Sequence, residues 1–68
     1  MLIYLVIEKT HYGDEYKKVY KTKEEAVSRF NNWKEDIEED NHTSDASMEI
    51  FEIDSEKATI KLIMSKYY

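Results

Sequence analysis

The residues of this chain that could carry chemistry are carboxylates, and most of them fall in one stretch. Residues 35–56 contain ten of the fifteen acidic residues and no Lys or Arg. The ten acids are Glu35, Asp36, Glu38, Glu39, Asp40, Asp45, Glu49, Glu52, Asp54 and Glu56. This stretch carries a charge of −10, whereas residues 1–34 carry +2 and residues 57–68 carry +3. The net charge of −5 therefore hides a strongly polarised chain.

These carboxylates do not predict catalysis. General acid–base catalysis needs a carboxyl group in an apolar cleft that raises its pKa, and a chain of 68 residues has little room for one. The chain has no Cys, no Gly-rich phosphate loop and no nucleophile elbow. The acids do not match the spacing of a calcium loop, and His11 and His42 lack the spacing of metal ligands. We therefore expect no enzyme activity, no metal and no cofactor.

The spacing of the acids favours binding by charge. Glu35 and Glu39 are four residues apart, so on a helix their Cβ atoms would lie about 5–6 Å apart. Glu52 and Asp54 are two residues apart, so on a strand they would share one face. Rows of carboxylates at such spacings resemble the phosphate backbone of a nucleic acid in charge density. The simpler interpretation is a solvated surface that keeps a small protein soluble.

A helix predicted over residues 22–40 must position the first five acids. Thr22 and Glu25 form a capping-box pattern at its start. The apolar residues that follow are Ala26, Phe30, Trp33 and Ile37. Their spacings of four, three and four predict one apolar stripe along a helix of roughly 27 Å. Acids in its last turns oppose the helix dipole, at a cost of up to about 0.3–1 kcal/mol each. This local conflict is the strongest functional signal in the sequence.

Four strands complete a ββαββ order. The predicted strands are residues 2–8, 16–21, 48–54 and 59–65. Gly13 supplies the positive φ that the turn of the first hairpin needs, residues 41–46 form a polar loop, and residues 66–68 are expected to fray. The sequence thus predicts a single α+β domain over residues 1–68, with a four-stranded, mainly antiparallel sheet and one helix packed on one face.

A single helix leaves one face of this sheet uncovered. We expect the first and fourth strands at the centre, because they are the most apolar. The fourth strand should place Ile60, Leu62 and Met64 on one face and Ile63 on the other. The uncovered face is expected to show several of Leu2, Tyr4, Tyr16, Tyr20, Met48 and Ile63. Because such a patch usually marks an interface, a homodimer through it is one hypothesis.

The second predicted strand carries a different binding pattern. Its aromatic and basic residues are Tyr16, Lys17, Lys18, Tyr20 and Lys21. Interleaved aromatic and basic side chains are typical of surfaces on which single-stranded nucleic acid stacks its bases. An amphipathic edge strand is the simpler interpretation, since Lys also blocks unwanted strand pairing. The acidic half of the molecule would in addition repel a polyanion at close range.

The function that these observations favour is inhibition through binding. In size, charge layout and composition, the chain resembles the short acidic proteins that phages make against host nucleases or polymerases, including DNA mimics and CRISPR inhibitors. The resemblance implies a protein that occupies the basic nucleic-acid-binding groove of a partner enzyme and does not bind nucleic acid directly. The apolar run over residues 1–7 lacks the basic flank and cleavage site of a signal peptide and is too short to span a bilayer, so we expect a cytoplasmic protein that does not bind a membrane.

The expected partner-binding residues combine the acids with one aromatic anchor. They are Glu35, Asp36, Glu38, Glu39, Asp40, Asp45, Glu49, Glu52, Asp54 and Trp33. Two alternatives stay open. The first is a small regulatory or structural module, homodimeric or not, that binds a protein through its apolar sheet face. The second is a single-stranded nucleic-acid binder that uses Tyr16 and Tyr20 with Lys17, Lys18 and Lys21.

Overall fold

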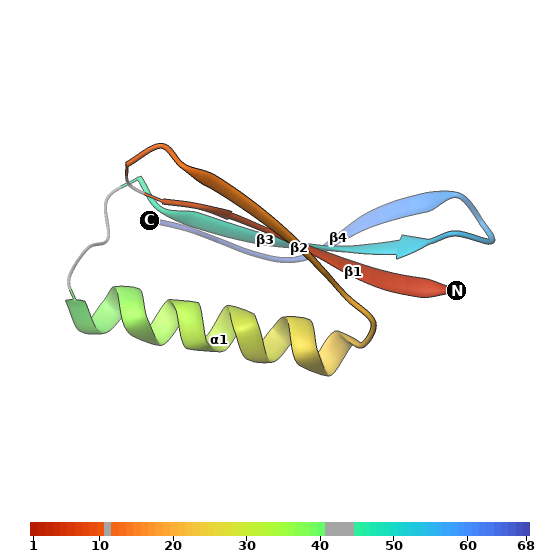
Figure 1. Cartoon of the computed structure of the whole chain (residues 1–68), viewed down its shortest axis with the longest axis horizontal. Helices are drawn as coiled ribbons and strands as arrows, with labels where there is room; N and C mark the ends of the chain where they lie inside the picture. Colours follow the sequence, from red (N-terminus) through yellow and green to blue (C-terminus); the bar gives the residue numbers. More distant parts are fainter. Residues whose placement is uncertain (11, 41–44) are drawn as a thin grey trace.

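The strands and the helix follow one another as the sequence predicts, and they form an α+β fold (Figure 1). The structure is a computed structural model that describes residues 1–10, 12–40 and 45–68. Its elements are β1 (Leu2–Lys9), β2 (Glu15–Tyr20), α1 (Lys23–Asp40), β3 (Ser47–Asp54) and β4 (Thr59–Tyr67). The predicted loop over residues 41–46 is described only at its last two residues, and His11 and His42 lie outside the described ranges.

The sheet has the strand order β2-β1-β3-β4, and all its neighbouring strands are antiparallel. The prediction that the first strand is central is confirmed, but the prediction for the fourth strand is wrong because β4 is an edge strand. The reason lies in β3, which supplies Met48 and Ile50 as the largest fully buried side chains. β4 is equally apolar, yet Ile60 and Leu62 are exposed, so apolar content alone does not identify a central strand.

The capping box at the start of α1 is present in a modified form. The Thr22 hydroxyl accepts a hydrogen bond from the Glu25 backbone N–H (3.3 Å) and donates one to the Glu25 carboxylate (2.9 Å). The first backbone bond of the helix joins the Ala26 N–H to the Thr22 carbonyl (3.4 Å). These bonds fix where the helix begins, and the helix then runs to Asp40 as the sequence predicts.

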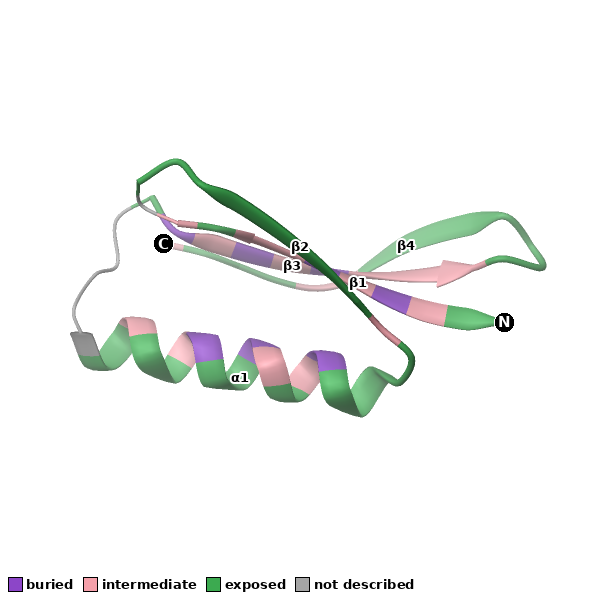
Figure 2. Cartoon of the chain, viewed as in Figure 1, coloured by how far each residue is buried: buried purple, intermediate pink, exposed green. Residues whose placement is uncertain are grey.

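The core lies between α1 and one face of the sheet. Three residues of the predicted helical stripe are buried, and Ile37 packs against them half-buried. The buried residues are Tyr4, Val6, Ala26, Phe30, Trp33, Ala46, Met48 and Ile50. Figure 2 shows the buried positions of α1 on the surface that is turned toward the sheet. Burial of these side chains, at about 1.5–3 kcal/mol for a large one, holds the two layers together.

The face covered by the helix is not the one that we expected. Tyr4 and Met48 were predicted on the uncovered face, but they are buried beneath α1. The uncovered side, here called the outer face, carries Ile3, Leu5 and the residues that pair beside them. The prediction failed because β1 is apolar on both of its faces, so its period of two does not tell which face the helix covers.

Two details of β4 also differ from the prediction. A register shift between Ile50 and Phe51 pairs Ile50 with Met64 but Phe51 with Leu62. Met64 and Leu62 therefore lie on opposite faces, because a bulge inserts one extra residue into the alternation. The C-terminal residues were expected to fray, yet β4 extends to Tyr67. Backbone bonds then join the Tyr68 N–H to the Ala46 carbonyl (2.8 Å) and the Asp45 N–H to the Tyr68 carbonyl (3.0 Å).

Candidate binding surfaces

The acidic residues in the last turns of α1 form the first candidate surface, the acidic helix end, which comprises Glu35, Asp36, Glu38 and Glu39. All four side chains are exposed, and the last turn contains no basic residue. Glu38 accepts a hydrogen bond from the Tyr68 hydroxyl (3.0 Å). The other three carboxylates have no hydrogen bond or ion pair with any residue that the structure describes. The surface is thus a solvated cluster of negative charge.

The remaining acids of the predicted site do not join the acidic helix end. Because β3 starts beside the end of α1 and runs back along the sheet, Glu52 and Asp54 lie at the opposite end (Figure 1). Glu52 accepts a hydrogen bond from the Tyr4 hydroxyl (3.4 Å). Asp54 accepts two from backbone N–H groups of the β3–β4 turn, at 3.0 and 3.2 Å. Both carboxylates therefore have roles within the fold.

Three further residues of the predicted site lie in three different parts of the fold. Glu49 pairs across the strands with Ile7, so it lies on the outer face. Asp45 is an exposed turn residue with a φ of 63°, and Asp40 is the last residue of α1. The acids that the structure places are thus distributed over the end of α1, both ends of the sheet and its outer face.

Trp33 does not serve as a surface anchor. Only 4% of its surface is exposed, and its ring packs at 5.9 Å from the Phe30 ring and 5.6 Å from the Tyr68 ring. The interpretation of Trp33 as a core residue is confirmed, and its prediction as a partner contact is wrong. The helical spacing from Phe30 to Trp33 indicates this burial, because both residues belong to the stripe that faces the sheet.

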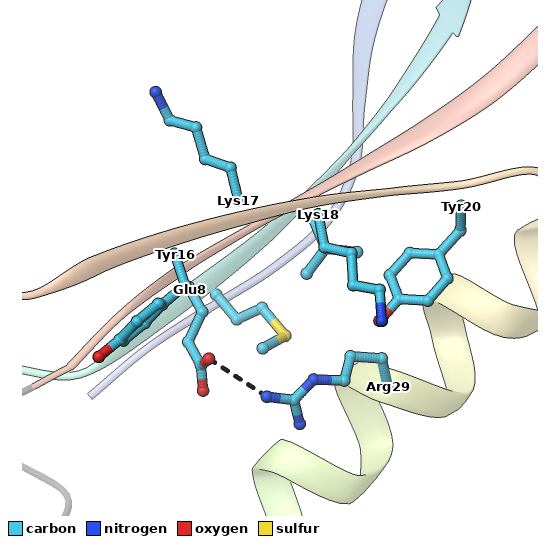
Figure 3. A pocket seen from close by; sticks show the side chains of 8 residues that line it. Glu8, Tyr16, Lys17, Lys18, Tyr20 and Arg29 are labelled. Carbon is cyan, nitrogen blue, oxygen red and sulfur yellow. Dashed lines mark hydrogen bonds and ion pairs between the residues drawn. The ribbon is translucent and has the colours of Figure 1, made fainter.

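The second candidate surface is an open groove of about 540 Å³ between β2 and α1 (Figure 3). Val6 and Met48 lie at its base. The polar and aromatic residues that line it are Glu8, Tyr16, Lys17, Lys18, Tyr20 and Arg29. Arg29 donates a hydrogen bond to the Glu8 carboxylate at 3.2 Å, so one of the groove's cations is already paired.

Strand alternation divides the basic residues of the β2 pattern. Tyr16, Lys18 and Tyr20 pair with residues on the helix-covered side of β1, so they turn toward the groove. The Lys18 ammonium lies 5.3 Å from the centre of the Tyr20 ring. Lys17 instead pairs with Ile7 on the other side of the sheet, and its side chain points away from the groove in Figure 3. Lys21 is exposed just after the strand. The groove therefore combines two aromatic rings with Lys18, whose ammonium forms no ion pair with any described residue.

Three tyrosines bind their protons more tightly than usual. Hydrogen bonding to the Glu49 carboxylate (2.7 Å) is the main reason that the pKa of Tyr67 is raised. Desolvation is the main cause for Tyr68, followed by its hydrogen bond to Glu38, and both effects raise its pKa. Desolvation likewise raises the pKa of Tyr4. A neutral tyrosine that donates to a carboxylate is a structural contact, and it does not indicate an acid–base site.

The described residues contain no metal-binding arrangement of three or more His, Asp or Glu side chains. In the same part of the chain, no helix combines the length and apolarity that crossing a membrane requires. Comparison with protein-family models, curated proteins and solved structures finds no match to this chain. Any functional assignment therefore rests on the surfaces described above.

Proposed function

We propose that this chain is a small binding protein that occupies the basic, nucleic-acid-binding groove of a partner enzyme. The acidic helix end makes the contact, and it does so by charge. The observation that carries the proposal is the exposure of Glu35, Asp36 and Glu39 without an ion pair to any described residue. Unpaired carboxylates at a helix C-terminus cost stability, so a compensating role in binding explains why they are present.

The proposal uses fewer residues than the sequence suggests. Glu52 and Asp54 hold the far end of the sheet through Tyr4 and the β3–β4 turn, so their carboxylates are already engaged. Trp33 is buried, so the proposal assigns it no role in contacting the partner. A cluster of four carboxylates mimics a short run of phosphates, and it attracts Lys and Arg side chains over roughly a Debye length, about 8–10 Å at physiological salt.

Capture from a cell lysate at two ionic strengths tests the proposal. The immobilised chain should retain a basic nucleic-acid-binding protein at about 50 mM salt and release most of it at about 500 mM, because exposed charges are then screened. A variant with Glu35→Lys, Asp36→Lys and Glu39→Lys should retain it at least roughly tenfold less. Retention that is independent of both salt and these substitutions contradicts the proposal.

A second candidate function is favoured by the groove between β2 and α1. Tyr16 and Tyr20 are four strand residues apart on the groove side, roughly 13 Å, with Lys18 between them. An extended single strand of nucleic acid could stack bases on the two rings and place a phosphate beside Lys18, with about 1–3 kcal/mol for each stacked base. This candidate requires direct binding of nucleic acid. The first proposal, here called the decoy proposal because the chain takes the place of nucleic acid in a partner's groove, excludes such binding.

Fluorescence anisotropy of a labelled single-stranded oligonucleotide separates the two candidates. The decoy proposal predicts no binding up to high micromolar concentrations of the chain. If binding occurs, Tyr16→Ala and Tyr20→Ala should each weaken it, and Tyr12→Ala serves as the matched control because Tyr12 is exposed outside the groove.

A further inference from the structure

The outer face of the sheet is apolar over one half. The cross-strand row through Leu5 joins Val19, Leu5, Phe51 and Leu62, and the next row joins Ile3, Ile53 and Ile60. Ile7 adjoins these two rows on β1. The exposed fractions are 54% for Val19, 46% for Leu62 and 70% for Ile60. These eight residues are here called the apolar patch, and none of them belongs to the core beneath α1.

The patch fills about half of the outer face. With strands about 4.8 Å apart and side-chain rows about 6.6 Å apart, its eight residues cover about 250 Å² in projection. The whole chain exposes 4847 Å², whereas a folded protein of 8.2 kDa typically exposes about 4,500 Å². The molecule is also thin, with extents of 40 × 21 × 15 Å. A second layer packed on the outer face would bury apolar side chains on both faces of the sheet instead of one.

The charges of the outer face point to a particular occupant. The ionisable residues that share this face within the four strands, apart from Tyr67, are Lys9, Glu15, Lys17 and Glu49. They sum to zero, although the chain carries −5. A face that meets its own copy needs near-neutral charge to avoid repulsion, whereas a face for a strongly basic or acidic partner would be biased in sign. No ionisable side chain lies within the two apolar rows, so none needs to be desolvated there.

We infer that the outer face binds a second copy of this chain, sheet against sheet, with the apolar patch at the centre. Two sheets pack face to face about 10 Å apart, and identical faces related by a two-fold axis form a closed dimer. The two patches together cover about 500 Å² in projection, and the rest of the outer face adds to this area. Because an interface below about 1,200 Å² is typical of weak complexes, we expect dissociation in the micromolar range. This inference stands independently of the proposed function.

Sedimentation equilibrium on the full chain from about 1 to 500 µM tests the inference. We expect a monomer of 8.2 kDa at the lowest concentrations and a dimer at the highest. The double variant Ile60→Lys and Leu62→Lys should weaken dimerisation at least tenfold without unfolding, because both side chains are exposed in the monomer. Leu2→Lys is the matched control, since Leu2 is 43% exposed but pairs on the helix-covered side of the sheet.

Each outcome of this experiment decides the inference. A wild-type chain that stays monomeric at 500 µM overturns it, and leaves the apolar patch for a different protein. A dimer that survives Ile60→Lys and Leu62→Lys, or one that Leu2→Lys disrupts, also overturns it. If the circular-dichroism spectrum shows that the double variant is unfolded, a second experiment takes its place: backbone NMR chemical shifts of the wild type are followed as the protein is diluted. The shifts must then cluster on outer-face residues, and shifts clustered on α1 refute the assignment.

Discussion

At the scale of single residues, Ala58 and Asp45 have backbone conformations that most side chains disfavour. Their φ angles are 54° and 63°. Asp tolerates this left-handed region because its short polar side chain bonds locally, whereas Ala has no such compensation. Ala58→Gly should therefore raise the free energy of unfolding by roughly 1 kcal/mol. Urea denaturation measures this change. A loss of stability, as expected for Gly at an ordinary position, would refute the assignment of strain to Ala58.

The raised pKa values of Tyr67 and Tyr68 make stability depend on alkaline pH. The hydroxyls donate to Glu49 and Glu38 while neutral, so the native state holds these protons more tightly than the unfolded state does. The stabilising contribution is complete below the usual tyrosine pKa of 10.0 and is lost as pH rises through the raised native values.

The free energy of unfolding should accordingly fall as the pH rises above about 10. The double variant Tyr67→Phe and Tyr68→Phe should show a smaller fall. Urea midpoints measured at several pH values for the wild type and the double variant provide the test. Tyr16→Phe is the control because Tyr16 is exposed and its hydroxyl makes no hydrogen bond with any residue that the structure describes. An unchanged alkaline slope in the double variant would show that these hydroxyls do not carry the effect.

At the scale of elements, the end of α1 should trade stability against binding. Glu39→Lys places a cation at the negative end of the helix dipole and should raise stability by about 0.3–1 kcal/mol. Glu24→Lys is the matched control in the first turn, where an acid is favourable, and it should lower stability by a similar amount. Thermal unfolding of both variants provides the measurement. If Glu39→Lys destabilises the protein, the acids at the end of α1 do not reduce the stability of the helix, and this explanation of their presence fails.

Periodicity predicts the elements of this fold well, but not the faces that they bury. The spacing of Ala26, Phe30 and Trp33 predicts the helical stripe because a single helix with one apolar side has only one way to pack. β1 is apolar on both faces, so the burial of Tyr4 rather than Leu5 depends on which side α1 crosses. The bulge beside Phe51 is likewise absent from the sequence pattern, because it arises from strand pairing.

At the scale of the whole molecule, the fold separates acids that are neighbours in sequence. The antiparallel return of β3 carries Glu52 away from the end of α1, and the pleat places Glu49 on the outer face. Sequence reasoning finds the acidic helix end because a helix keeps Glu35 and Glu39 adjacent. It fails for the strand acids because their position depends on pairing over long range. In the inferred dimer, each copy presents one acidic helix end on the side away from the shared sheets.

We propose that the acidic helix end occupies a basic groove made for nucleic acid. The most direct measurement is displacement from immobilised DNA loaded with the DNA-binding proteins of a cell lysate. Wild-type chain should elute a bound protein. The variant with Glu35→Lys, Asp36→Lys and Glu39→Lys should elute at least roughly tenfold less.

The control variant reverses three acids elsewhere, Asp14, Glu15 and Glu56, so that both variants have the same net charge. It should elute the bound protein as the wild type does. Equal activity of the helix-end variant and the wild type would contradict the account. Equal loss in both variants would also contradict it, because net charge rather than the helix end would then be responsible.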